Sequence, residues 1–134
     1  LHSDPPVPAE IGAARDQVDA LLDSCGIDFA SVASWVGVGG TVTSLSALAQ
    51  GLPSYDRARV HGSVLARADL AALTGRLLEL PIAQVVTLPT MVPGRADVIC
   101  AGALICATVA RRVPAELFVS EADILDGIVL GLAG

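Results

Sequence analysis

The segment of this sequence most suited to binding a ligand is the glycine-rich pentapeptide Gly37-Val38-Gly39-Gly40-Thr41. It follows an apolar run over residues 32–36 and opens a helical pattern over 41–50. Where a strand turns through glycines into a helix, several backbone N–H groups point at one spot, and the helix dipole adds partial positive charge there. A Cβ would obstruct both the turn and the approach of an anion. The pentapeptide therefore predicts either a phosphate-binding loop or a tight strand–helix connection without a ligand.

Arg95 is a second residue that could meet an anion, since it stands at the start of a predicted buried helix over residues 96–111. Its guanidinium could bind a phosphate bidentately, or it could pair with Asp97 or another carboxylate. The sequence leaves both uses open.

The motifs of common catalytic sites are absent from the sequence. There is no G-x-x-x-x-G-K-[ST], no G-x-S-x-G and no H-E-x-x-H, and the dinucleotide-binding fingerprint fails because Val42 stands where glycine is required. His61 is the only internal histidine, and we expect it to be hydrogen-bonded and structural. Asp123 and Asp126 are expected on a solvated helix face. The residues by themselves indicate one anion site, with no catalytic group and no metal ligand.

Composition sets limits on the class of protein. A length of 134 residues corresponds to one domain, and a net charge of −6 argues against general nucleic-acid binding. The three cysteines lack the spacing of a disulfide framework or zinc site, so we expect buried, reduced thiols. The longest apolar stretch, residues 98–110, is too short for a membrane span. These features predict a cytoplasmic protein without a membrane partner.

Hydrophobic periodicity and turn residues place the elements. Helices are predicted over residues 8–25, 41–50, 69–80 and 96–111, with a final helix capped by Ser120, and short strands over 32–38 and 117–120. Residues 55–59 are predicted as a polar connection and 60–64 as a short extended stretch, and 82–86 are undecided between helix and extended chain. We expect Asp16, Asp19 and Asp23 on the solvent face of the first helix. Gly102 is expected to allow close helix contact.

Two strands separated by helices indicate a small parallel sheet in an α/β fold that is otherwise mostly helical. Two strands are too few for a self-sufficient parallel sheet, so further strands are expected before Leu1. An unpaired sheet edge invites self-association, which predicts a homodimer.

Five segments in order resemble the exopolyphosphatase/guanosine pentaphosphate phosphohydrolase family. They are residues 1–6 (LHSDPP), 37–45 (GVGGTVTSL), 60–62 (VHG), 94–99 (GRADVI) with Gly102, and 119–127 from Val-Ser to Asp-Gly. The resemblance implies an actin-like ATPase fold, in which two ribonuclease H-like domains flank the active site. Residues 1–134 would then form a single domain that matches most of the second domain, a truncated half of that fold without the first domain.

The resemblance also implies a function. The family removes terminal phosphate from linear polyphosphate, or from guanosine pentaphosphate, by metal-assisted attack of water. Its catalytic glutamate and most metal ligands lie upstream of the residue matching Leu1, so neither catalytic residues nor ligands for magnesium are expected in this chain, which alone should be inactive. Gly39, Gly40 and Thr41 would form a wall of the substrate cleft, with Thr43 and Arg95 as weaker candidates for phosphate binding.

Two other functions stay open for the same fold. One is half of a sugar- or acetate-kinase-like phosphotransferase, and the other is a non-catalytic ligand-sensing module. The sequence does not choose between polyphosphate and guanosine pentaphosphate as the ligand.

Overall fold

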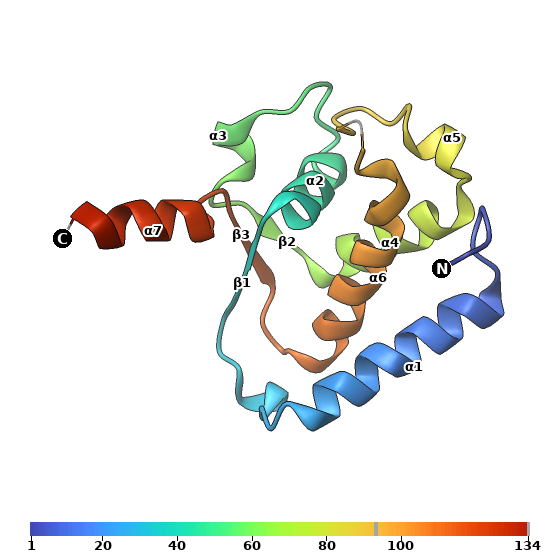
Figure 1. Cartoon of the computed structure of the whole chain (residues 1–134), viewed down its shortest axis with the longest axis horizontal. Helices are drawn as coiled ribbons and strands as arrows, with labels where there is room; N and C mark the ends of the chain where they lie inside the picture. Colours follow the sequence, from blue (N-terminus) through green and yellow to red (C-terminus); the bar gives the residue numbers. More distant parts are fainter. Residues whose placement is uncertain (93, 134) are drawn as a thin grey trace.

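The computed structural model describes residues 1–92 and 94–133, the side chain of Ala133 excepted. Helices surround one side of a small sheet, and a last helix projects away from the rest (Figure 1). The helices are α1 (Pro8–Ser24), α2 (Gly40–Ala49), α3 (Arg57–Val60), α4 (Arg67–Glu79), α5 (Ile82–Val85), α6 (Ala96–Arg112) and α7 (Ile124–Ala133), with a 3-10 turn at Phe29–Ser31. The strands are β1 (Trp35–Val38), β2 (Val64–Leu65) and β3 (Leu117–Ser120).

The sheet is mixed, and the expectation of a purely parallel sheet is wrong. Its order is β1-β3-β2, with β1 parallel and β2 antiparallel to β3. Gly62, with a φ of 76°, turns the chain just before β2, and its amide donates to the carbonyl of Val119 at 2.9 Å. This turn brings the two residues of β2 back alongside β3 in the opposite direction. The first strand is also shorter than predicted, because it begins at Trp35.

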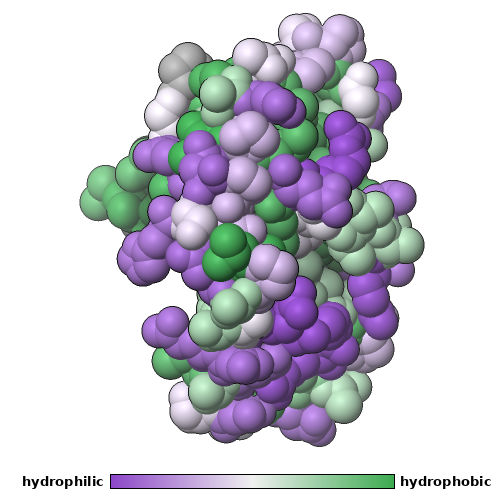
Figure 2. Space-filling model, turned by 90° about the vertical axis from the view of Figure 1, so that its right-hand side faces the viewer, coloured by the Kyte–Doolittle hydropathy of each residue, from purple (hydrophilic) through white to green (hydrophobic). Residues whose placement is uncertain are grey.

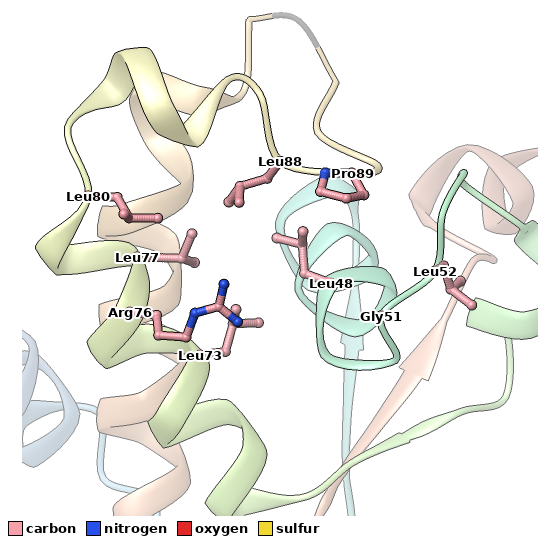
Figure 3. Close-up of a pocket in the computed structure, with 9 residues that line it drawn as sticks. All are labelled: Leu48, Gly51, Leu52, Leu73, Arg76, Leu77, Leu80, Leu88 and Pro89. Atoms are coloured by element: carbon pink, nitrogen blue, oxygen red, sulfur yellow. The ribbon is translucent and has the colours of Figure 1, made fainter.

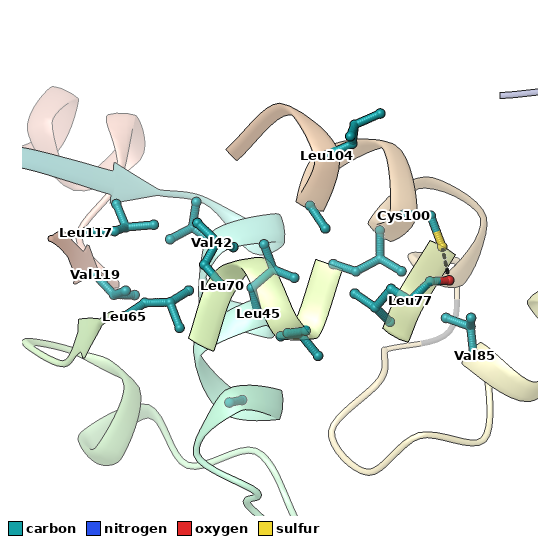
Figure 4. Packing of buried hydrophobic residues seen from close by; sticks show 14 of the residues in the cluster. Val42, Leu45, Leu65, Leu70, Leu77, Val85, Cys100, Leu104, Leu117 and Val119 are labelled. Atoms are coloured by element: carbon teal, nitrogen blue, oxygen red, sulfur yellow. Dashed lines mark hydrogen bonds between the residues drawn. The ribbon is translucent and has the colours of Figure 1, made fainter. Parts of the chain in front are cut away.

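One face of the sheet carries the core. Leu65, Leu117 and Val119 point from this face and are buried against α2, and α4 and α6 pack on α2 to complete the core (Figure 4). Helix α2 is buried at six consecutive positions, residues 42–47, because it lies between the sheet and the other two helices. Burying a leucine side chain contributes about 1.5–3 kcal/mol, so this layer is the main source of stability.

The opposite face of the sheet is apolar and uncovered by the described residues. Val36, Phe118 and Val64 occupy neighbouring register positions across the three strands, and they are 55%, 42% and 61% exposed. Because side chains alternate along a strand, these residues lie on the face away from α2.

Helix α1 is held against α6 by charge as well as by packing. The Asp19 carboxylate accepts hydrogen bonds from Arg111 and Arg112, each at 2.8 Å, and Asp23 pairs with Arg112. The hydrogen bond from Arg112 is the main reason that the pKa of Asp19 is lowered. Asp19 and Asp23 therefore anchor the helix, whereas they were expected merely to face solvent. Hydrophilic residues gather over the lower part of the face seen in Figure 2, at the height of α1 in Figure 1.

Short helices occupy two segments that periodicity did not assign. Helix α3 forms within the predicted polar connection because the Asp56 carboxylate accepts from the amides of Ala58 and Arg59, at 2.9 and 3.3 Å. Helix α5 falls in the segment left undecided between helix and extended chain.

The cap of α7 is Asp123, and the expected cap Ser120 ends strand β3 instead. The Asp123 side chain accepts from the amide of Leu125, and the Asp126 side chain accepts from the amide of Asp123, both at 2.8 Å. These reciprocal bonds satisfy amides at the helix start. No helix within residues 1–92 and 94–133 is long and apolar enough to cross a membrane.

Candidate functional site

The glycine loop joins β1 to α2 as expected. Gly39 has a φ of 83°, which favours glycine, and it is the N-cap residue of α2. The amide of Thr43 closes the first helical turn on the carbonyl of Gly39 at 3.2 Å. Among the hydrogen bonds of the described residues, none uses the amides of Gly40 and Thr41. These amides are therefore available at the positive end of the α2 dipole.

Arg95 lies directly against this helix start. Its Nη1 donates to the Gly40 carbonyl and to Ser44 Oγ, both at 3.2 Å. It forms no ion pair with Asp97 or with any other carboxylate of the described residues. Of the two uses that the sequence left open, pairing with a carboxylate is therefore not observed. Among the hydrogen bonds of residues 1–92 and 94–133, the Arg95 guanidinium uses Nη1 alone, which leaves its other N–H groups for an anion.

Arg95 and the loop border a hollow of about 260 Å³. Its lining residues come from the α2 start, the segment before α3, the approach to α6 and the segment after β3: Gly39, Gly40, Thr43, Tyr55, Val92, Arg95, Glu121 and Asp123. Four of the five predicted site residues are thus brought together. The fifth, Thr41, does not line the hollow. Its Cγ2 would lie 2.5 Å from a Cβ at Gly102, so its side chain packs against α6 through the close contact that Gly102 was expected to allow.

Two carboxylates in the hollow were not predicted as site residues. Glu121 accepts a hydrogen bond from the Tyr55 hydroxyl and lies 3.8 Å from Arg57 Nε. Asp123 caps α7. The signal for them lies in the topology: Val38 pairs with Ser120 in parallel register, so the segments after β1 and β3 leave the sheet at the same edge.

His61 has the structural role expected of it. Its Nδ1 accepts from the backbone amide of Glu121 at 3.1 Å, which ties the turn before β2 to the segment after β3. The histidine thereby helps to position the carboxylate side of the hollow.

The described residues do not supply a metal site by themselves. No group of three or more His, Cys, Asp or Glu residues within them could hold an ion. In the hollow, the carboxylate of Glu121 is already engaged by Tyr55 and Arg57, and that of Asp123 by the amide of Leu125. What the arrangement can do is bind an anion on one side, through amides and a guanidinium, and repel it from the other.

Comparison with known proteins gives a consistent result. The model of the Ppx/GppA phosphatase family matches residues 1–133. Exopolyphosphatase 2 of Mycobacterium tuberculosis, in strains CDC 1551 / Oshkosh and ATCC 25618 / H37Rv, is 43% identical over 143 residues. That match covers 100% of this chain and 44% of the relative, so the chain spans less than half the length of these curated proteins.

Solved structures agree with this assignment. An exopolyphosphatase-like protein is 32% identical with a TM-score of 0.90, over 98% of this chain and 45% of that one. The Aquifex aeolicus Ppx/GppA family member is 26% identical with a TM-score of 0.90, over 99% of this chain and 43% of that one. The expected actin-like ATPase fold is confirmed, with a mixed sheet in place of a parallel one.

Proposed function

Because the chain belongs to the Ppx/GppA phosphatase family, we propose that it forms one wall of a cleft in which terminal phosphate is removed from inorganic polyphosphate or guanosine pentaphosphate. The observation that carries this proposal is the pairing of Arg95 with the start of α2 beside a polar hollow. The chain would correspond to most of the second of two domains. The other domain would supply the catalytic base and the ligands for magnesium.

The residues of this wall would act by holding and orienting the phosphate chain. The amide of Gly40 and the free N–H groups of Arg95 can donate to phosphate oxygens, because helix N-termini and guanidinium groups both favour anions. The Thr43 hydroxyl, which lies 3.4 Å from the Gly40 carbonyl, is placed beside them. Magnesium would supply charge neutralisation from the other domain.

The carboxylates of Glu121 and Asp123 would set the orientation within the hollow. A polyphosphate oxygen that approached them would be repelled, whereas the opposite wall attracts it. The anion is thereby directed towards Arg95 and away from the segment after β3. Glu121, fixed by Tyr55 and Arg57, keeps this repulsive group in a defined place.

The uncovered apolar surfaces support a partner for this chain. Val36, Phe118 and Val64 leave one sheet face bare, and α7 carries large apolar side chains that are more than half exposed. A ten-residue helix such as α7, which packs little against the other elements that the structure describes, is marginal in water. We propose that the part of the longer relatives that this chain does not span covers these surfaces, and that a homodimer forms when it is absent.

Two measurements test the proposal. The first is phosphate release from polyphosphate in the presence of magnesium. The chain alone should show no turnover, and a rate near that of a full-length family member would contradict the division of roles.

The second is titration of the chain with tripolyphosphate. We expect binding in the millimolar range, about −4 kcal/mol, because half the donors are missing. Arg95→Gln should weaken it about fivefold to tenfold, since hydrogen bonds to charged groups are worth more than neutral ones. Arg59→Gln is the matched control, because Arg59 is exposed on α3 and does not line the hollow. Equal affinities for the two variants would remove Arg95 from the site.

A further inference from the structure

A second hollow of the fold is apolar and lies away from the phosphate side. It has a volume of about 170 Å³ and lies between α2, α4 and the segment after α5 (Figure 3). Its lining residues are Leu48, Gly51, Leu52, Leu73, Arg76, Leu77, Leu80, Leu88 and Pro89. It shares no lining residue with the phosphate hollow.

The floor of this cavity belongs to the core. Leu52, Leu73 and Leu77 are buried, and Leu48, Leu80 and Leu88 are partly buried against them. An enclosed apolar cavity of about 150 Å³ has room for benzene, and the pocket here has a similar volume but opens to solvent at exposed Arg76. The space here therefore suits an apolar group of about four to six carbon atoms.

Arg76 is the cationic residue in the lining of this apolar cavity. The Arg76 guanidinium points from α4 towards α2, beside Leu73 and Leu77 (Figure 3). Within residues 1–92 and 94–133, no carboxylate forms an ion pair with it. An arginine at the rim of an apolar cavity can bind a carboxylate through two parallel hydrogen bonds.

We propose that this cavity is a binding site for a small monocarboxylate with a short aliphatic chain. The chain would occupy the space between the leucines, and the carboxylate would bind Arg76 at the rim. The leucine-lined space and the Arg76 guanidinium together favour an amphipathic anion. A neutral apolar molecule would make no ion pair with Arg76, and a polyanion would have to place charge in the leucine-lined space.

Hexanoate titrated into the 134-residue chain, followed by amide and leucine methyl chemical shifts, tests this proposal. We expect shifts at Leu73, Leu77 and Leu88 and a dissociation constant on the order of 1–10 mM, in keeping with a ligand of so few atoms. Arg76→Gln should weaken hexanoate binding about threefold to fivefold, as for a partly exposed ion pair, and should leave hexanol binding unchanged. Arg59 is also exposed and lies outside the cavity, so Arg59→Gln should leave the affinity for hexanoate unchanged.

Three results would overturn the proposal. Hexanol or hexylammonium that bound as well as hexanoate would show that Arg76 selects no anion. Shifts confined to α7 or to Val36 and Phe118 would show that the ligand prefers the exposed apolar surfaces. Absence of any shift would show that the cavity takes no such ligand. None of these outcomes bears on the phosphate hollow, which is tested separately with tripolyphosphate.

Discussion

Arg95 occupies the space that a side chain at Gly40 would need. A Cβ built on Gly40 would lie 2.4 Å from Arg95 Cζ, inside any normal contact distance. Glycine at position 40 thus does more than allow a turn, because it lets a guanidinium rest on the first residue of α2. The loop and the arginine form one unit although they lie far apart in the sequence.

Gly40→Ala should therefore displace Arg95 and weaken tripolyphosphate binding about as much as Arg95→Gln does. The backbone at Gly40 is not in the left-handed region, so alanine itself fits the helix start. Gly75→Ala is the control, because nothing lies within 4 Å of a Cβ there. Titration calorimetry on both variants is the measurement, and an unchanged affinity in Gly40→Ala would show that Arg95 is not needed.

Gly102→Ala should destabilise the chain although alanine favours helices. Its Cβ would meet Thr41 Cγ2 at 2.5 Å, and overpacking of this kind costs about 1–3 kcal/mol, against a gain of up to about 1 kcal/mol in helix propensity. Gly75→Ala lacks the clash, so it should stabilise α4 by up to about 1 kcal/mol. Urea unfolding of both variants checks this, and equal shifts would show that α2 and α6 can move apart without cost.

Asp19 should make stability depend on pH in the acidic range. Its pKa is lowered in the folded chain, chiefly by the hydrogen bond from Arg112, so its contribution is present above its unfolded pKa of about 3.9 and is lost as the pH falls through the folded value. The difference in unfolding free energy between the wild type and Asp19→Asn should be constant from about pH 5 to 8 and should shrink below about pH 4. Asp16→Asn, at an exposed position without an ion pair among the described residues, should leave the curve unchanged.

The three thiols should react at different rates. Cys25 is exposed, contrary to the expectation that all three would be buried, whereas burial raises the pKa of the Cys100 and Cys106 thiols. Iodoacetamide at pH 8 should therefore modify Cys25 first, because the thiolate is the reactive form. Mass spectrometry at successive times gives the order, and early labelling of Cys100 would indicate opening between α4 and α6.

The bare sheet face should drive self-association of the chain. Val36→Thr combined with Phe118→Thr keeps strand-forming residues and removes apolar surface, so it should weaken dimerisation at least about tenfold. Sedimentation over a range of concentrations measures this. The double variant Leu125→Gln with Leu130→Gln on α7 is the matched control, which distinguishes dimerisation through the sheet face from dimerisation through α7. A wild type that stays monomeric at all concentrations would contradict the prediction.

The sequence predicted the parts of this fold that carry strong local patterns. Composition and spacing of nearby residues are enough to predict the amphipathic helices, the apolar strands β1 and β3, and the glycine loop. Strand β2 carries a weaker signal: a short extended stretch is predicted over residues 60–64, but its two-residue pairing with β3 at Val64–Leu65 has no periodicity to indicate it. The cap of α7 was misplaced because Ser120 and Asp123 both precede an acidic residue by three positions, and strand pairing engages Ser120.

The lining of the polar hollow was predicted on one side only. Gly39, Gly40 and Arg95 carry signals in their own neighbourhoods, whereas Glu121 lines the hollow only through the parallel register of Val38 with Ser120. That register depends on pairing between segments that are far apart in the sequence, so the local sequence around Glu121 does not indicate it.

The pairing of β1 with β3 also has a consequence for the order in which the chain folds. Helices α4 and α6 are closer in sequence and make extensive contacts, whereas β1 must wait for a strand near the other end of the chain. Contacts between distant segments form slowly because the closure of the intervening loop costs entropy. During synthesis the helical layer can therefore consolidate first, and the edge of the sheet that borders the polar hollow is completed only after residue 121 has left the ribosome.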